Sequence, residues 1–152
     1  MSSKFQFPDV AKLTTRDECA RAFCSLVARL ITHLIKHITD HDCLDILDEI
    51  QGKYRLARDT AFTNEQIIER MGHTLLKWSL PIKNHDERFF LQSSLDSLIS
   101  DAVTKESEPP SVAINDKNRE LLARALTPNL RTILFDVLNV MIIIYAKYSV
   151  MN

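Results

Sequence analysis

The sequence predicts an all-α fold: a single-domain bundle of about five to six helices packed around a hydrophobic C-terminal helix. Three observations lead to this prediction. Apolar residues recur at the three- and four-residue spacing of amphipathic helices along most of the chain. Only two glycines occur in 152 residues, whereas sheet-rich and nucleotide-binding α/β folds use many glycines in turns and phosphate loops. Residues 128–152 form a helical pattern that is apolar around most of its circumference.

A helix as apolar as residues 128–152 must be surrounded by other helices or by lipid. Its candidate span from Ile133 to Met151 has 19 residues, about the minimum for crossing a hydrocarbon layer. Asp136, Asn139 and Lys147 interrupt the apolar surface, and a membrane span would have to accommodate them at a free-energy cost. We therefore expect the core helix of a bundle, with a membrane anchor as the alternative that is not favoured.

Local capping signals place the first two helices. Thr15 and Glu18 form a capping box, because each side chain can satisfy an unpaired amide at the start of a helix. The apolar spacing that follows extends this helix to about His41. Asp42 is expected to cap a second helix, in which Gly52 should cost about 1 kcal/mol relative to alanine.

The third helix has the best-defined beginning in the chain. Thr63 and Gln66 have the spacing of a second capping box, and Phe62 and Ile67 stand at the positions of a hydrophobic staple. Pro81 is expected to end this helix, because proline cannot continue the hydrogen-bond ladder.

Three further boundaries follow along the chain. Asn84 is expected to begin a fourth helix, which ends before a mobile loop at about residues 105–116. Asp116 is expected to cap a short fifth helix. Thr127 and Pro128 have the residue types preferred at the cap and first position of the last helix.

Residues 1–13 lack a helical pattern and are predicted to form an extended N-terminal arm, with residues 14–152 forming the helical bundle domain. Phe5 and Phe7 are the candidate partner-binding residues of this arm. Arms with aromatic anchors often become ordered on a neighbouring protein, so these side chains favour an interaction role.

The charge of the chain argues against nucleic acid as a partner. Its 19 basic and 20 acidic side chains are interspersed and give a net charge of −1, so no long-range field of one sign arises. A small basic grouping of Lys53, Arg55 and Arg58 is typical of a solvated helix face. Three cysteines without CxxC spacing, and no apolar run for a signal peptide at the N-terminus, predict a reducing, cytoplasmic location.

Three histidines are the strongest candidates for chemistry. His33, His37 and His41 are spaced four residues apart on the first expected helix, a pattern that helical metal sites use. No partner motif elsewhere completes such a site, and histidines are common at the margin of an apolar face. The sequence therefore predicts no metal, cofactor or catalytic residue, and these histidines remain low-ranked metal candidates.

Two functional classes fit these observations, and a metal-binding helical bundle is a third. The first is a non-catalytic interaction or structural protein, a subunit or adaptor whose partner is another protein or a second copy. The alternative is a membrane-associated helical regulator, since an apolar helix wrapped by amphipathic ones is similar to the Bcl-2-like bundles in architecture alone. The region around Trp78 does not carry the Asn-Trp-Gly-Arg signature of that family.

Overall fold

In a computed structural model, residues 5–86, 88, 98–99 and 116–151 are described, and all their regular secondary structure is helical. The long helices are α1 (Arg16–His37), α2 (His41–Leu56), α3 (Asn64–Lys77) and α8 (Pro128–Ser149). The shorter elements are η1 (Val10–Lys12), the π-helical turn η2 (Ala57–Ala61), α4 (Ser79–Lys83) and α7 (Asp116–Ala125). The predicted all-α bundle is confirmed, with a long apolar C-terminal helix packed against the other helices.

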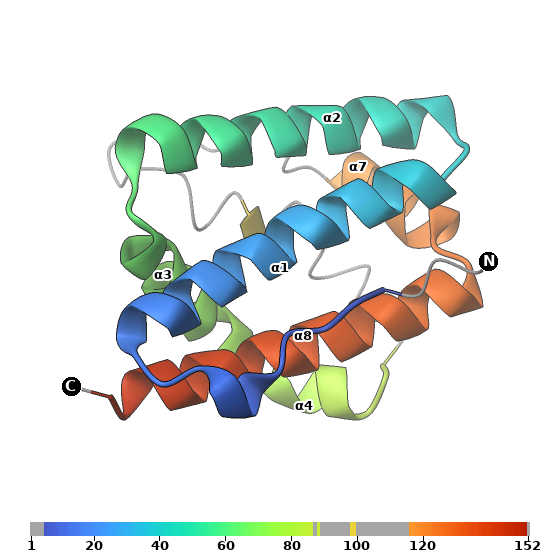
Figure 1. Ribbon diagram of the computed structural model, residues 1–152. Helices are drawn as coiled ribbons and strands as arrows, with labels where there is room; N and C mark the ends of the chain where they lie inside the picture. Colours follow the sequence, from blue (N-terminus) through green and yellow to red (C-terminus); the bar gives the residue numbers. More distant parts are fainter. Residues whose placement is uncertain (1–4, 87, 89–97, 100–115, 152) are drawn as a thin grey trace.

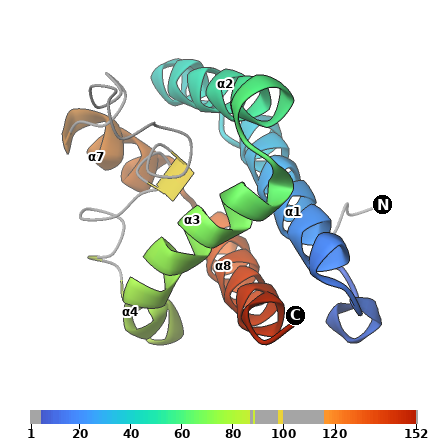
Figure 2. The ribbon, with the colours of Figure 1, turned by 90° about the vertical axis from the view of Figure 1, so that its left-hand side faces the viewer.

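Helix α1 runs between α2 and α8 and contacts both (Figure 1). Helix α3 crosses behind this layer and contacts α1 and α8 (Figure 2). Helix α4 packs on α8, on the side away from α1, while α7 packs on α2. The described core therefore lies between α1 and the helices on its three sides.

The core is built mainly by α1 and α8. Phe23 and Leu30 of α1, and Val137, Met141 and Ile144 of α8, have no exposed surface. The apolar spacing of both helices puts these side chains on the faces where the helices meet, and their burial is the main stabilising contribution.

Helix α8 also has an outer face that no described residue covers. Asp136 is exposed, as the polar stripe predicted, but Ile143 is 54% exposed and lies on this outer face too. Among the described residues, α8 is the one helix long and apolar enough to cross a membrane, and 39% of its most apolar window is buried.

The C-terminal end of α8 is tied to three other elements. The guanidinium of Arg16 donates to the carbonyl oxygen of Met151 at 2.7 Å and stacks 4.0 Å from the ring centroid of Tyr148. The Tyr148 hydroxyl donates to Glu69 of α3, and the Lys147 ammonium donates to the carbonyl oxygen of Val10. The end of α8 is thus docked on the body of the molecule.

The helix starts that the sequence predicted from capping boxes and proline are confirmed. The reciprocal bonds between Thr63 and Gln66 are both present. At the first helix only one half of the predicted capping box forms: the Thr15 hydroxyl accepts from the Glu18 amide, while the Glu18 carboxylate accepts from the Thr14 and Thr15 hydroxyls. Thr127 caps α8, with proline at the first helical position. Short-range chemistry alone specifies these boundaries, because each cap bonds to an amide three residues ahead.

The expected end of the first helix and start of the second are wrong. Helix α1 ends at His37, and Ile38 has an extended backbone. Asp40, not Asp42, caps α2, because its carboxylate accepts a hydrogen bond from the Cys43 amide at 3.1 Å. An aspartate that bonds the amides of the next helix competes with continuation of the previous one.

Pro81 does not end the third helix. Helix α3 ends at Lys77, and Pro81 is the third residue of α4, where the missing amide has no helical acceptor to lose. Asn84 is the residue at the end of α4 and does not begin a helix. Residues 85, 86 and 88 are not helical either, while the remainder of the expected fourth helix, apart from residues 98–99, and residues 105–115 of the expected loop lie outside the described residues. Helix α7 is described over Asp116–Ala125, and because residue 115 lies outside the described residues, the cap at Asp116 stays a prediction.

Candidate functional site

The described part of the N-terminal arm lies on the bundle. Residues 5–9 have no regular structure and run across the body before η1 (Figure 1). Arg29 of α1 holds them, because its guanidinium donates to the carbonyl oxygen of Gln6 at 2.8 Å. The Phe5 ring centroid lies 5.9 Å from the same guanidinium. The arm therefore forms one wall of a groove on the surface of the bundle.

The aromatic residues of the arm meet two of the candidate histidines. The ring centroids of Phe5 and Phe7 are 5.1 Å apart, and those of Phe5 and His33 are 5.6 Å apart in an edge-on contact. The His33 and His37 ring centroids are 4.3 Å apart. Phe7 remains 41% exposed at the outer end of this cluster.

The three histidines do not share a helix. His41 begins α2, beyond the break at residues 38–40, so the expected spacing of four and eight residues on one helix is lost. Within the described ranges, no three His, Cys, Asp or Glu side chains are grouped so that they could hold a metal ion. His33 and His37 pack with the arm.

A groove of about 490 Å³ opens between the arm, α1 and η2. A smaller hollow of about 140 Å³ between α1 and the C-terminal end of α2 continues it, since Ala28, Thr32 and Arg58 line both. We call these two hollows together the arm groove. Its lining residues are Phe5, Gln6, Ser25, Ala28, Arg29, Ile31, Thr32, His33, Lys36, Gln51, Tyr54, Arg55, Arg58 and Asp59.

The arm groove is positively charged. Arg29 and Lys36 come from α1, Arg55 and Arg58 come from the end of α2 and η2, and Asp59 is the one acidic residue among the lining residues. Helix α1 has no acidic residue between Glu18 and its end, so every charge that it adds to this face is positive. Clustered charge of one sign in a hollow attracts ligands of the opposite sign.

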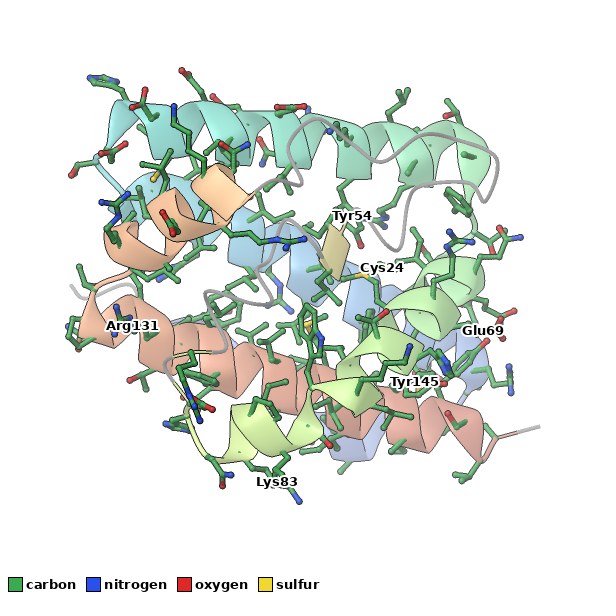
Figure 3. The ribbon with its side chains drawn as sticks, turned by 180° about the vertical axis from the view of Figure 1, so that it is seen from behind. Cys24, Tyr54, Glu69, Lys83, Arg131 and Tyr145 are labelled. Atoms are coloured by element: carbon green, nitrogen blue, oxygen red, sulfur yellow. The ribbon has the colours of Figure 1, made fainter. Side chains whose placement is uncertain are left out.

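Two of these arginines have buried, unsatisfied donors. The Nε atoms of Arg29 and Arg58 are both buried, and neither has a hydrogen-bond acceptor within the part of the chain that the structure describes. The Arg58 guanidinium lies 5.8 Å from the ring centroid of Tyr54, whose hydroxyl donates to the carbonyl oxygen of Cys24 (Figure 3). A buried N–H without an acceptor costs free energy, which an incoming acceptor would recover.

Burial lowers the pKa of His33 below its ordinary value of 6.5, and the neighbouring His37 and Lys36 lower it further. The unfolded chain therefore binds this proton more tightly than the folded chain does. Arg29 of α1, Phe5 of the arm and Asn129 at the start of α8 border the same histidine, and none of them supplies a carboxylate.

We expect the free energy of unfolding to decrease as the pH is lowered from about 8 to about 5, because His33 must then be protonated against these positive neighbours. His33→Gln should flatten this dependence. Urea unfolding at several pH values measures the effect. A wild-type and a His33→Gln curve with the same slope would contradict the assignment.

The thiols are unsuited to nucleophilic chemistry. Cys19, Cys24 and Cys43 are all buried and unpaired. Burial raises the pKa of the Cys43 thiol to about 11, and nearby Asp40 raises it too, while burial also raises the pKa of Cys19 and Cys24. Because the thiolate is the reactive form, these cysteines act as small core side chains.

The sequence named only part of this site. Phe5, Phe7, His33 and His37 were singled out separately, and the structure brings them together. The prediction of a solvated face for Lys53, Arg55 and Arg58 fits the first two residues, because Lys53 forms an ion pair with Glu49 on α2 and Arg55 is exposed. Arg58 turns into the arm groove, because η2 redirects the chain after α2.

Comparison of the chain with models of protein families, with curated proteins and with solved structures found no match.

Proposed function

We propose that this chain is a non-catalytic helical interaction protein, a subunit or adaptor of a larger protein assembly that docks its partner at the arm groove. The single observation that supports this proposal most is the groove itself. It is open and positively charged, and it is built from segments far apart in the sequence. Phe5 forms the wall on the side of the arm, and the ring of the exposed Phe7 packs beside it, outside the lining residues.

The remaining chemistry of the described residues agrees with a docking role. The cysteines are buried thiols with raised pKa values, and His33 packs against Phe5 of the arm. Exposed aromatic and arginine side chains are the residue types that contribute most at protein interfaces. Arg29, Arg58 and the half-buried Phe5 line the arm groove, and the exposed Phe7 lies beside it.

Affinity capture from the native source tests this proposal. The wild-type protein is expected to retain a defined partner that the double variant Arg58→Glu/Lys36→Glu loses, because both side chains line the arm groove. Lys83→Glu is the matched control: Lys83 is exposed at the end of α4, beyond α8 from the groove (Figures 2 and 3). Equal capture by all three proteins, or a monodisperse monomer with no partner, would contradict the proposal.

A second candidate function, membrane association, draws its support from α8. This helix is long and apolar enough to cross a membrane, and Ile143 on its outer face is 54% exposed. The docked C-terminal end weighs against it, because Arg16 and Glu69 would have to release Met151 and Tyr148 before α8 could leave the bundle.

A further inference from the structure

The positive side chains that line the arm groove favour an anionic ligand. The Nε atoms of Arg29 and Arg58 are shielded from solvent and have no acceptor within the described residues. A carboxylate accepts two parallel hydrogen bonds from one guanidinium, which makes this pair stronger and more directional than a neutral hydrogen bond. A ligand with carboxylates can therefore pair with the guanidinium groups of Arg29 and Arg58, which line the groove.

The base of the groove is apolar and favours a ligand that is not uniformly charged. Ile31 is fully buried beneath the smaller hollow, Ala28 lies between the two hollows, and the Phe5 ring forms the arm wall. These surfaces suit apolar side chains placed between acidic ones. A peptide carries both kinds of group within a few residues, because neighbouring side chains of an extended segment point in opposite directions.

The surroundings of the groove disfavour nucleic acid. A phosphate backbone needs a continuous positive track, and the whole chain has a net charge of −1. The solvent face of α2 carries the exposed acidic residues Asp45, Asp48 and Glu49. The positive surface of the groove therefore does not continue across α2. The positive charge is local and matches a short acidic segment.

We propose that the arm groove binds a segment of a partner protein in which acidic and apolar residues are mixed, with its carboxylates against Arg29 and Arg58. This inference rests on the proposed function and names the chemistry of the partner. The arm closes one side of the site, because Arg29 donates to Gln6 and so holds the Phe5 wall in place.

Selection from a phage-displayed library of random peptides tests the inference without assuming a partner. Wild-type protein is the bait, and Arg58→Glu protein, shown to be folded by circular dichroism, is used for counter-selection. We expect the selected peptides to be enriched in aspartate and glutamate interspersed with apolar residues. Selection of peptides with no acidic enrichment would overturn the proposal.

A fluorescein-labelled selected peptide then gives the affinity by anisotropy. Arg58→Gln and Lys36→Glu should each weaken binding of the peptide, and the charge reversal Lys36→Glu should weaken it by about tenfold. The control variant Lys83→Glu should bind the peptide like wild type. Raising the salt from about 50 to about 500 mM should weaken binding as well. Binding that none of these changes affects would overturn the inference.

Three other outcomes distinguish this inference from the proposed function. Tighter binding of a single-stranded oligouridylate than of the peptide would overturn the inference in favour of nucleic acid. Self-association lost on Asp45→Lys/Asp48→Lys replacement would assign the groove to the acidic face of a second copy and overturn it too. A third outcome is a native partner whose binding requires the groove residues but is weakened neither by salt nor by the selected peptide. This outcome would overturn the inference about an acidic segment, while the proposed docking function would still hold.

Discussion

Replacing Ile144 by glutamate is expected to unfold the protein, whereas the same replacement at Ile143 is expected to leave it folded. The two residues are neighbours on α8, yet Ile144 has no exposed surface and Ile143 is 54% exposed. Glutamate at residue 144 would place an unpaired carboxylate in the core, at a cost of about 4 kcal/mol or more. This is comparable with the whole stability of a small domain, about 5–15 kcal/mol.

Glutamate at residue 143 should change the free energy of unfolding by no more than about 0.5 kcal/mol, because its carboxylate stays in water. Circular dichroism and urea unfolding of both variants measure the contrast. Ile144→Val is a milder variant that keeps the protein foldable, and it should cost about 0.5–1.5 kcal/mol. Equal destabilisation by glutamate at both positions would contradict the packing of α8.

The Ile143→Glu and Ile144→Glu variants also distinguish a core helix from a membrane span. In a lipid-embedded helix, glutamate at either position would face the penalty for a charge in hydrocarbon, about 2.5–3.5 kcal/mol at the centre. Flotation with phosphatidylcholine and phosphatidylserine vesicles provides the readout. Wild-type protein that floats with vesicles, and an Ile143→Glu variant that does not, would favour the membrane-associated role of α8.

The features predicted from the sequence are those with short-range causes. Thr15, Thr63 and Thr127 cap their helices because each bonds to an amide three residues ahead, and this pattern is visible in the sequence. The apolar helical periodicity likewise gave the helical class and the apolar C-terminal helix. The predicted start of the second helix is wrong because two aspartates close together in the sequence can both cap a helix. The predicted cap is Asp42, whereas the first helix already ends at His37, Ile38 is extended, and Asp40 is the cap.

The candidate site could not be predicted because its contacts are long-range. The arm reaches His33 and Arg29 from more than twenty residues away along the chain, and η2 brings Arg58 beside them. No local spacing encodes such a meeting. The histidine pattern was misleading for the same reason, since the break after His37 separates His41 from a face that a continuous helix would have shared.

Replacing Gly72 by alanine is expected to destabilise the protein, although alanine is the better helix former. Gly72 lies in α3 against the ring of Tyr145, where α8 passes beside α3 (Figure 3), and an added Cβ would overlap that ring. The overlap involves Cγ, Cδ1 and Cε1 of the ring, and Cγ is bonded directly to the Tyr145 Cβ, so a small rotation of the ring does not relieve it. Overpacking of this kind costs about 1–3 kcal/mol.

Gly52 provides the matched control, because nothing lies within 4 Å of a Cβ added there. Gly52→Ala should stabilise the protein by about 0.5–1 kcal/mol, which is the usual gain from alanine in the interior of a helix. Thermal unfolding should therefore shift in opposite directions for the two variants, by about 2–4 °C per kcal/mol.

A double-mutant cycle assigns the cause of the Gly72 effect. In a Tyr145→Ala background the ring is gone, so Gly72→Ala should no longer destabilise and should show the gain seen at Gly52. The coupling energy between the two positions then measures the repulsion between the Cβ added at residue 72 and the Tyr145 ring, that is, between α3 and α8. A Gly72→Ala variant as stable as Gly52→Ala in the wild-type background would mean that α8 does not pack on α3, and the docked arrangement of the C-terminal helix would fail with it.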